Sequence, residues 1–410
     1  MTAEILTFGC RLNAYESEVM RGLSGNTAAD TVIINTCAVT AEAERQARQA
    51  VRRVARERPD ACIVVTGCAA QIDPAAWADL PNVRRVLGND DKLKPESWLP
   101  GAGSMVSDIM AARETAAHLV TAFAGRARAF VQVQQGCDHR CTFCVIPFGR
   151  GRNRSVPIGA IANQVRALVA GGYHEVVLTG VDIASYGPDL PGVPSLGQMI
   201  RRVLQAVPEL PRLRLSSIDP AAIDDDLWRL IAEEPRLMPH LHLSLQAGSD
   251  LILKRMRRRH LRAGAMAVID RARNLRPGIA VGADLIAGFP TETDAMFEDT
   301  LRFVQEAALP YLHVFPYSER AGTPAARMPA VPKPVRKERA AALREAGAVE
   351  AHRFFTAQVG RTVSLLTEGE QSGHTEHFAP VRLAQLSVPG RLLRARIVGV
   401  TKDTLLAEAA

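Results

Sequence analysis

The sequence predicts an α/β protein in three parts. These are an N-terminal α/β domain with a parallel sheet, a central (β/α)6 partial barrel and a small C-terminal antiparallel β-barrel. Strand-like and helical segments alternate from the N-terminus to about residue 307, which is typical of parallel α/β folds. Near residue 360 the pattern changes to short strand-like segments separated by glycine turns, which favours a barrel or sandwich. We expect the domains at residues 1–110, 123–352 and 355–410.

The first hundred residues predict the N-terminal sheet. Residues 13–23 have a helical pattern, and Thr40 is a predicted N-cap of a second helix, which ends before Pro59. Three short apolar runs predict strands: residues 4–8, 31–35 and 61–66.

Cysteines follow all three of these strands directly, at Cys10, Cys37 and Cys68. The carboxyl ends of parallel strands form the ligand-binding edge of an open sheet. We therefore expect three thiols from distant segments to meet there. Cys62 instead starts its strand, about 20 Å from that edge, and is expected to be a small buried hydrophobe.

A second α/β series follows a connector at residues 91–120, which is rich in proline and glycine. Six strands with intervening helices fit an open partial barrel, since a full eight-fold barrel needs more chain. The predicted strands are residues 130–134, 175–179, 212–216, 240–245, 280–285 and 311–315. The predicted helices are residues 157–170, 196–207, 225–234, 261–275 and 293–307.

The C-terminal part begins with a charged helix at residues 335–355, after a proline-rich stretch. Its predicted strands are residues 362–367, 378–383, 391–398 and 405–407. About fifty such residues form a barrel that suits a binding module.

Composition places the chain among soluble globular proteins. Of its 410 residues, 47% are hydrophobic and 23% charged. No signal peptide and no run of about 18 apolar residues is present, so we expect no membrane association. The odd number of cysteines favours a reducing, cytoplasmic compartment. A net charge of +7 is compatible with a nucleic-acid partner but does not establish one.

The remaining cysteines, Cys137, Cys141 and Cys144, are spaced too closely for a disulfide framework. Three thiolates in one loop suit an iron–sulfur cluster whose fourth iron has no protein ligand. A zinc site is the alternative, but it normally needs a second cysteine pair or histidines, and His139 has no matching partner.

This CxxxCxxC spacing on the first strand of a (β/α)6 series resembles the radical S-adenosylmethionine (SAM) superfamily. The resemblance implies a 4Fe-4S cluster whose open iron binds SAM, and reductive cleavage of SAM to a 5′-deoxyadenosyl radical. It implies that Phe143 packs near the cluster and that Arg258 holds the methionine carboxylate, for which a guanidinium is well suited. The other implied SAM contacts are Gly180, Asp182, Ser244, Gln246 and Gly288, the last allowing a close backbone approach to the adenine.

Two cysteine triads, an N-terminal α/β domain and a C-terminal barrel together resemble the methylthiotransferases over almost the entire chain. The resemblance implies a second, auxiliary 4Fe-4S cluster on Cys10, Cys37 and Cys68, whose open iron carries or supplies sulfur. The C-terminal part is similar to a TRAM domain, an RNA-binding module, through Gly373, Thr375, Phe378, Pro380 and Val381. His374 and His377 have a metal-like spacing, but we expect them in an exposed loop.

Several segments are most similar to the bacterial branch that acts on threonylcarbamoyladenosine in tRNA: TFGCRLNAYESE, NTCAVTAEAERQARQ, VTGCAAQ, PFGRGRNRS and RLSSIDP. That resemblance implies methylthiolation of carbon 2 of the adenine next to the anticodon (adenosine 37 in tRNA numbering). One SAM methylates the sulfur, and a second yields the radical that removes hydrogen from carbon 2. The alternatives are the branches acting on isopentenyladenosine in tRNA or on ribosomal protein S12, and, more remotely, a non-enzymatic zinc- and RNA-binding protein.

The partners implied are the anticodon stem-loop of tRNA, an electron donor such as flavodoxin or ferredoxin, and a sulfur source. Arg150, Arg152 and Arg154 follow the tight cysteine group and are expected to contact anticodon-loop phosphates or the threonyl carboxylate. Basic residues of the terminal barrel are expected to follow the RNA backbone: Arg391, Arg394 and Arg396.

Overall fold

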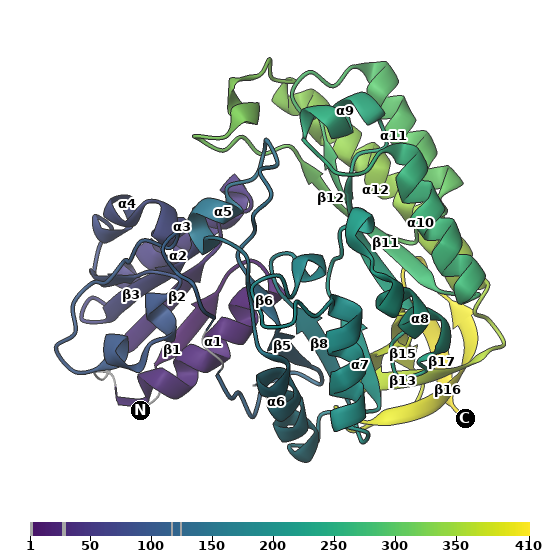
Figure 1. Ribbon diagram of the computed structural model, residues 1–410, viewed down its shortest axis with the longest axis horizontal. Coiled ribbons are helices and arrows are strands. Elements are labelled where there is room, and N and C mark those ends of the chain that lie inside the picture. Colours follow the sequence, from purple (N-terminus) through teal and green to yellow (C-terminus); the bar gives the residue numbers. More distant parts are fainter. Residues whose placement is uncertain (1–2, 27–29, 116–117, 124) are drawn as a thin grey trace.

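The computed structural model describes residues 3–26, 30–115, 118–123 and 125–410. Figure 1 shows the N-terminal sheet and its helices on one side, the central strands and helices in the middle, and the C-terminal barrel packed against the central part. Over those ranges, no helix has the length and apolar character needed to cross a membrane.

The N-terminal sheet is parallel throughout, as predicted, with strand order β1-β2-β3-β4. It contains one strand that the sequence did not predict, β4. Its strands are β1 (Glu4–Thr7), β2 (Thr31–Thr36), β3 (Cys62–Gly67) and β4 (Val83–Leu87). The helices that follow them are α1 (Arg11–Leu23), α2 (Ala41–Glu57), α3 (Cys68–Ile72) and α4 (Pro74–Ala78).

Both faces of this sheet are buried, as a parallel sheet requires. Val32 and Ile34 of β2 pack into the core that includes α2, whereas Ile33 lies in the cluster with Met20 of α1. Helix α1 also contributes Tyr15 and Val19 to the main core of the central domain. Helix α1, which follows Cys10, is therefore packed between the two domains.

In its described residues the connector is irregular apart from two short 3-10 turns, η2 (Asp91–Leu93) and η3 (Pro95–Trp98), and an isolated bridge of Met105 with Leu87. Residues 116–117 of the predicted connector lie outside the described residues. Cys62 begins β3, as predicted, but it is half-buried rather than buried.

The six predicted central strands are all present and parallel, but they form two three-stranded sheets, β5-β8-β9 and β10-β11-β12. Isolated bridges, Leu213 with Leu237 and Ile218 with Leu243, join the two sheets. The strands are β5 (Ala129–Gln132), β8 (Glu175–Thr179), β9 (Arg212–Leu215), β10 (His240–Gln246), β11 (Ala280–Ala287) and β12 (Tyr311–Pro316).

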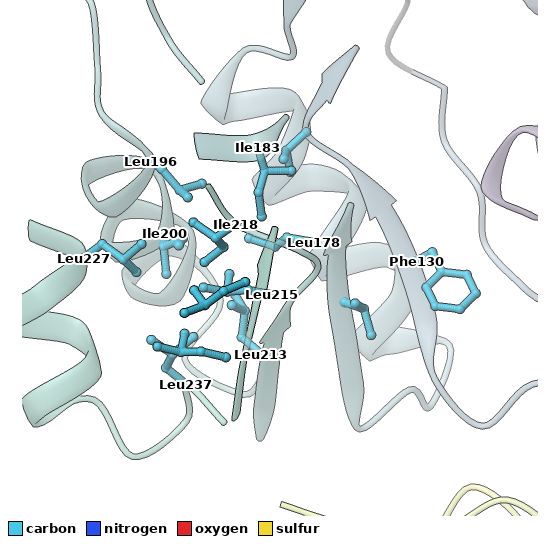
Figure 2. Close-up of a cluster of buried hydrophobic side chains, with 14 of the residues drawn as sticks. Phe130, Leu178, Ile183, Leu196, Ile200, Leu213, Leu215, Ile218, Leu227 and Leu237 are labelled. Carbon is cyan, nitrogen blue, oxygen red and sulfur yellow. The ribbon is translucent and has the colours of Figure 1, made fainter. Parts of the chain in front are cut away.

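Helices cover the outer face of these strands. They are α6 (Ile158–Ala170), α7 (Leu196–Ala206), α8 (Asp225–Glu233), α9 (Asp250–Arg255), α10 (Arg262–Leu275), α11 (Asp294–Glu306) and α12 (Lys333–Thr356). Figure 2 shows Leu213 and Leu215 of β9 packed with Leu196, Ile200 and Leu227 from α7 and α8.

Alternation along each strand places the intervening side chains on the inner face. We call this face the lumen; the residues that define it are Glu175, Arg214, His240, Asp284 and Tyr311.

The C-terminal part is a closed five-stranded barrel in the order β13-β14-β15-β17-β16. Its strands are β13 (Thr362–Thr367), β14 (Ser372–Thr375), β15 (Pro380–Leu383), β16 (Leu392–Val400) and β17 (Leu405–Ala409). The prediction of an antiparallel barrel is wrong at one seam, because β15 and β17 pair in parallel. Strand β14 was not predicted, since its SGHT segment has the composition of a turn.

The prediction that His374 and His377 lie in an exposed loop is wrong. His374 belongs to β14, stacks on Phe378 with ring centroids 4.7 Å apart and pairs with Glu368 at 3.0 Å. His377 is half-buried, with its ring 6.1 Å from that of Phe354. The ring of His374 therefore packs within the barrel, whereas that of His377 faces Phe354 of the preceding helix.

Candidate active site

The first cysteine triad lies at the carboxyl edge of the N-terminal sheet, as predicted. Cys10 precedes α1, Cys37 follows β2, and Cys68 begins α3. Gly9, at φ 93°, provides room for the second thiol, because a Cβ there would lie 2.6 Å from Cys37 Sγ. Three thiols at one edge, beside a glycine that makes space for sulfur, fit an iron–sulfur cluster held by three cysteines.

The polar groups around this triad donate hydrogen bonds to sulfur. The Val39 amide lies 3.4 Å from Cys37 Sγ, Asn89 Nδ2 lies 3.6 Å from Cys68 Sγ, and Arg150 Nε lies 3.1 Å from Cys68 Sγ. Burial raises the pKa of the Cys37 thiol to about 12. Donors of this kind suit thiolate ligands.

Arg150 is not a surface residue, which corrects its prediction as a tRNA contact. Its side chain is 2% exposed, and all five of its N–H donors are used within the protein. Nη1 donates to Glu16 and Gln135, Nη2 donates to Asn13 and Glu16, and Nε donates to Cys68. No donor remains for a phosphate or a carboxylate of a substrate.

Glu16 is the centre of this buried network. It accepts from Arg150 at 2.7 Å and from Lys92 Nζ at 2.8 Å, and none of its side chain is exposed. Burial alone would raise the pKa of Glu16, but Arg150 and Lys92 lower it to about 2. Lys92 also donates to Asn89 and Asn35, so the network links α1, the connector and the segment after the second triad.

Arg154 is also buried, at 3% exposure, and donates to the Arg152 carbonyl, so its prediction as a surface contact is corrected as well. Arg152 is exposed. Of the three predicted arginines, it is the one placed to reach a partner from the surface.

The second triad lies in a loop between two short paired strands, β6 (Gln134–Gln135) and β7 (Arg154–Ser155). Cys137, Cys141 and Cys144 are all half-buried. Burial raises the pKa of Cys137 to about 12 and that of Cys144 to about 11. Arg258 Nη1 lies 3.6 Å from Cys141 Sγ. Three thiols in one clamped loop fit the predicted cluster without further protein ligands.

A short helix connects the two triads. Helix α5 (Ile146–Arg150) begins two residues after Cys144 and packs on α3. The packing is close, because a Cβ on Gly149 would lie 3.2 Å from Cys68 Cβ. Asn89 Nδ2 also donates to the Gly149 carbonyl.

The predicted SAM contacts lie around the second triad. Asp182 Oδ2 lies 3.0 Å from His139 Nε2 of the cysteine loop. It also accepts a hydrogen bond from the Ser185 hydroxyl at 2.6 Å. Burial alone would raise the pKa of Asp182, but hydrogen bonds from His139 and Ser185 hold it below its usual range. Gly180 is closely packed, since a Cβ there would lie 2.8 Å from the Gln134 carbonyl oxygen.

Arg258 is held in place by two groups. Its Nη2 donates to the Ser244 carbonyl at 2.7 Å and pairs with Asp219 at 3.1 Å. Asp219 was singled out in the sequence only as part of the RLSSIDP segment, without this role. No spacing rule would have paired residues 39 positions apart.

Phe143 and Gln246 both line a pocket beside the second triad. Phe143 packs edge-on against Phe289, with centroids 6.4 Å apart, and Gln246 adopts a positive φ of 75° at the end of β10. Gly288 differs from its prediction, because a Cβ there would meet the side chain of Arg336 at 2.4 Å. The glycine therefore makes room for a protein side chain.

That pocket lies between the two triads and measures about 240 Å³. One wall is formed by Val39 and Thr40, which come shortly after Cys37 in the sequence. Another is formed by Phe143, which comes directly before Cys144. The remaining lining residues are Gln246, Asp284, Ile286, Phe315, Pro316, Tyr317 and Ser318.

The lumen contains charged residues that were not among the predicted site residues. Glu175 pairs with Arg128, Arg212 and Arg214. Asp284 Oδ1 lies 3.0 Å from His242 Nε2 and 3.1 Å from His313 Nδ1. The signal was present in RLRL of β9 and HLHL of β10, where polar residues alternate with leucines that face the helices.

Arg11, next to Cys10, also reaches the lumen. Burial lowers the pKa of its guanidinium, and the charges of Arg128 and Arg214 lower it further. Phe378 of the barrel, at φ 68°, closes the floor of the lumen. Its ring lies 5.3 Å from that of His240, 4.9 Å from the guanidinium carbon of Arg214 and 5.9 Å from that of Arg11.

Two family models match the chain. Residues 131–304 match the Radical SAM superfamily, and residues 2–88 match "Uncharacterized protein family UPF0004". The fold is also similar to the radical SAM methyltransferase TsrM from Kitasatospora setae, with a TM-score of 0.55 and 15% identity over 77% of this chain and 69% of that one.

Curated relatives match over nearly the whole chain. The "Threonylcarbamoyladenosine tRNA methylthiotransferase MtaB" of Rickettsia prowazekii is 53% identical over 97% of this chain and 95% of its own length. The protein of the same name from Thermotoga maritima is 35% identical over 92% and 90%. A "tRNA-2-methylthio-N(6)-dimethylallyladenosine synthase" of Novosphingobium aromaticivorans is 37% identical over 90% and 86%.

Proposed function

Because the chain belongs to the radical SAM methylthiotransferase family, with a threonylcarbamoyladenosine-type relative 53% identical, we propose that it methylthiolates N6-threonylcarbamoyladenosine in tRNA. The reaction is insertion at carbon 2 of the adenine next to the anticodon. The observation that carries the proposal is the pocket whose walls come from residues adjoining both cysteine triads. A base in this pocket is within reach of both sites, as a reaction that joins a carbon radical to a sulfur requires.

Membership of the family brings a 4Fe-4S cluster and SAM. We assign this cluster to Cys137, Cys141 and Cys144, and a second 4Fe-4S cluster to Cys10, Cys37 and Cys68. When bound, these groups supply the radical that activates carbon 2 and the sulfur that is inserted. The protein's own residues bind, orient and shield the reactants.

The residues around the second triad are assigned to SAM. Asp182, held ionised by His139 and Ser185, suits an ammonium group. Arg258 suits a carboxylate, and its contacts with Ser244 and Asp219 fix its orientation. Phe143 and Gln246 offer an apolar ring and an amide from the pocket wall. Gly180 and Gly288 contribute indirectly, because the absence of a side chain lets Gln134 and Arg336 pack against them.

The contacts with tRNA are assigned to exposed arginines. Arg152 lies just beyond the second triad, and Arg391, Arg394 and Arg396 are exposed on the terminal barrel. Alternate residues of β16 point outward, so Arg394 and Arg396 share one face. Cationic side chains at these positions suit contact with phosphates.

Three further assignments complete the proposal. The functional domains are residues 1–110, 123–352 and 355–410. An external reductant of the flavodoxin or ferredoxin kind and a sulfur source are needed. A tRNA substrate places the reaction in the cytoplasm.

Nucleoside mass spectrometry tests the proposal. The protein is reconstituted anaerobically with iron and sulfide, then given reductant, SAM and threonylcarbamoylated tRNA. The expected result is the 2-methylthio nucleoside. Modification of isopentenylated tRNA or of ribosomal protein S12 instead would move the chain to another branch. A colourless zinc protein without acid-labile sulfide would contradict the chemistry itself.

A further inference from the structure

Arg11 connects the first cysteine triad with the lumen. It is the first residue of α1 and follows Cys10 directly, and its side chain is half-buried. Its guanidinium carbon lies 5.9 Å from the centre of the Phe378 ring, on the floor of the lumen. One chain segment therefore supplies both a thiol at the triad and a cation in the lumen.

The guanidinium of Arg11 forms no hydrogen bond or ion pair with any residue in the described ranges. Its neighbours differ in this respect. Arg128 pairs with Glu175 and Glu368, Arg212 with Glu175, and Arg214 with Glu175. A partly buried cation without a counter-ion is costly, and the cost disappears when an anion binds.

The nearby acids, Asp284 and Glu175, are already engaged by other groups. Asp284 lies close to Arg11, but its Oδ1 is shared by His242 and His313. Asp284 also lines the pocket between the triads, so the pocket and Arg11 are both near the same carboxylate.

Further polar atoms near Arg11 lack partners. Both ring nitrogens of His240, which is 4% exposed, and the hydroxyl of Tyr311 are buried without a hydrogen bond to any residue that the structure describes. The two rings lie 5.5 Å apart, and His240 is close enough to Arg11 for their charges to interact. Buried polar atoms are normally paired, so these three atoms indicate a polar ligand.

We propose that Arg11 binds the carboxylate of the threonyl group of the substrate nucleoside, with His240 and Tyr311 facing its other polar atoms. The inference rests on the proposed function and names the specificity residue of that site. Carbon 2 and carbon 6 of adenine both flank N1, but their substituents point in different directions from the ring. A base with carbon 2 at the triads therefore directs its N6 substituent away from them, toward the lumen. The neutral isopentenyl group offers Arg11 no counter-ion.

The test measures binding of two nucleosides to the intact, cluster-loaded protein by calorimetry. One is N6-threonylcarbamoyladenosine, and the other is its uncharged carboxamide. The wild-type protein is expected to prefer the acid by about 10-fold or more, as a charge-assisted hydrogen bond gives. Arg11→Gln should reduce that preference to about 2-fold or less, and Arg11→Lys should retain part of it.

Arg229→Gln is the matched control, since it removes an exposed arginine on the outer helix α8. It should keep the wild-type preference. Affinity for the carboxamide shows whether each variant is still folded. The readout is the ratio of the two affinities, because partial unfolding lowers both affinities by the same factor. An unchanged ratio in Arg11→Gln, or no preference in the wild type, would overturn the inference.

Binding and turnover separate the two proposals. If the wild-type protein shows an Arg11-dependent preference for the acid but forms no methylthio product, the carboxylate subsite stands and the proposed reaction fails. If the product forms and the ratio is unaffected by Arg11→Gln, the reaction stands and the subsite is wrong.

Discussion

The two cysteine triads are built in opposite ways. The first collects its thiols from three strands spread over 59 positions, from Cys10 to Cys68, whereas the second takes all three from one loop, Cys137 to Cys144. Around the first triad a buried network of Glu16, Lys92 and Arg150 joins the separate segments. The second is clamped by a single short pair of strands, β6 and β7. A dispersed site needs a rigid surrounding framework, whereas a local site is shaped mainly by its own loop.

The charges around the triads differ as well. At the first triad, two buried cations share one carboxylate, which leaves positive charge beside Cys68. At the second, Arg258 is paired with Asp219, and Asp182 is paired with His139. Excess positive charge suits three thiolates, and paired groups suit the zwitterionic end of SAM.

The largest effects should come from removing one thiol of each triad. Cys144→Ala is expected to abolish both SAM cleavage and methylthiolation, because both need the radical. Cys10→Ala should retain most SAM cleavage while losing sulfur insertion. Deoxyadenosine and methylthio nucleoside, measured by mass spectrometry in the same reactions, distinguish the two. Retained deoxyadenosine in Cys144→Ala would refute the assignment of the radical site, and loss of both products in Cys10→Ala would make the first triad structural.

The next effect concerns the framework. Glu16→Ala leaves Lys92 and Arg150 buried without their shared carboxylate, so the free energy of unfolding should fall by about 3–5 kcal/mol. Denaturant unfolding measures the loss, and iron content reports whether the first cluster still assembles. Glu306→Ala, which removes an exposed partner of Arg262, is the control and should cost at most about 1 kcal/mol. Equal losses in both variants would contradict a special role for the network.

The same carboxylate makes the stability of the framework around the first triad depend on pH. The pKa of Glu16 is lowered from 4.5 to about 2 in the folded state, so its contribution is complete above pH 4.5. That contribution is expected to decrease as pH falls from 4.5 toward 2. The free energy of unfolding of the cluster-free chain can be measured with denaturant between pH 3 and 6. It should fall more steeply with decreasing pH in the wild type than in Glu16→Gln. Parallel curves would contradict the assignment.

The smallest effect compares two neighbouring arginines. Arg152→Gln removes an exposed cation and should weaken tRNA binding a few-fold, reducing the salt dependence of log Kd by about one. Arg150→Gln should leave that slope unchanged, because its donors are all used internally, and should instead lower iron content. Electrophoretic mobility shifts at several salt concentrations measure the slope. A reduced slope in Arg150→Gln would return it to the RNA surface.

The sequence predicted what depends on local pattern. The three thiols at strand ends, the six central strands and the tight cysteine loop all follow from periodicity and spacing, and the structure contains each of them. The sequence did not predict the partners of buried charges. Arg150 and Glu16 are 134 positions apart, and a run such as PFGRGRNRS looks like a basic surface until its partners are known.

The same limit explains the errors in the terminal barrel. Segment SGHT has the composition of a turn, and only its pairing with β13 and β15 makes it a strand. His374 stacks on Phe378 across the turn between β14 and β15, and this contact depends on a backbone turn that the sequence pattern did not show. Gly288 was assigned to a ligand although its space is taken by Arg336, because sequence shows where a glycine stands but not what lies opposite.

The parallel seam between β15 and β17 has a consequence for biosynthesis. Phe378 precedes β15, and β15 is held on one side by β17, which is made more than twenty residues later. A ribosome therefore releases the thiols of both triads long before the floor of the lumen can close. The floor can close only after the last strand has been made and has paired with β15. A protein truncated before β17 should accept iron yet resemble an arrested assembly intermediate.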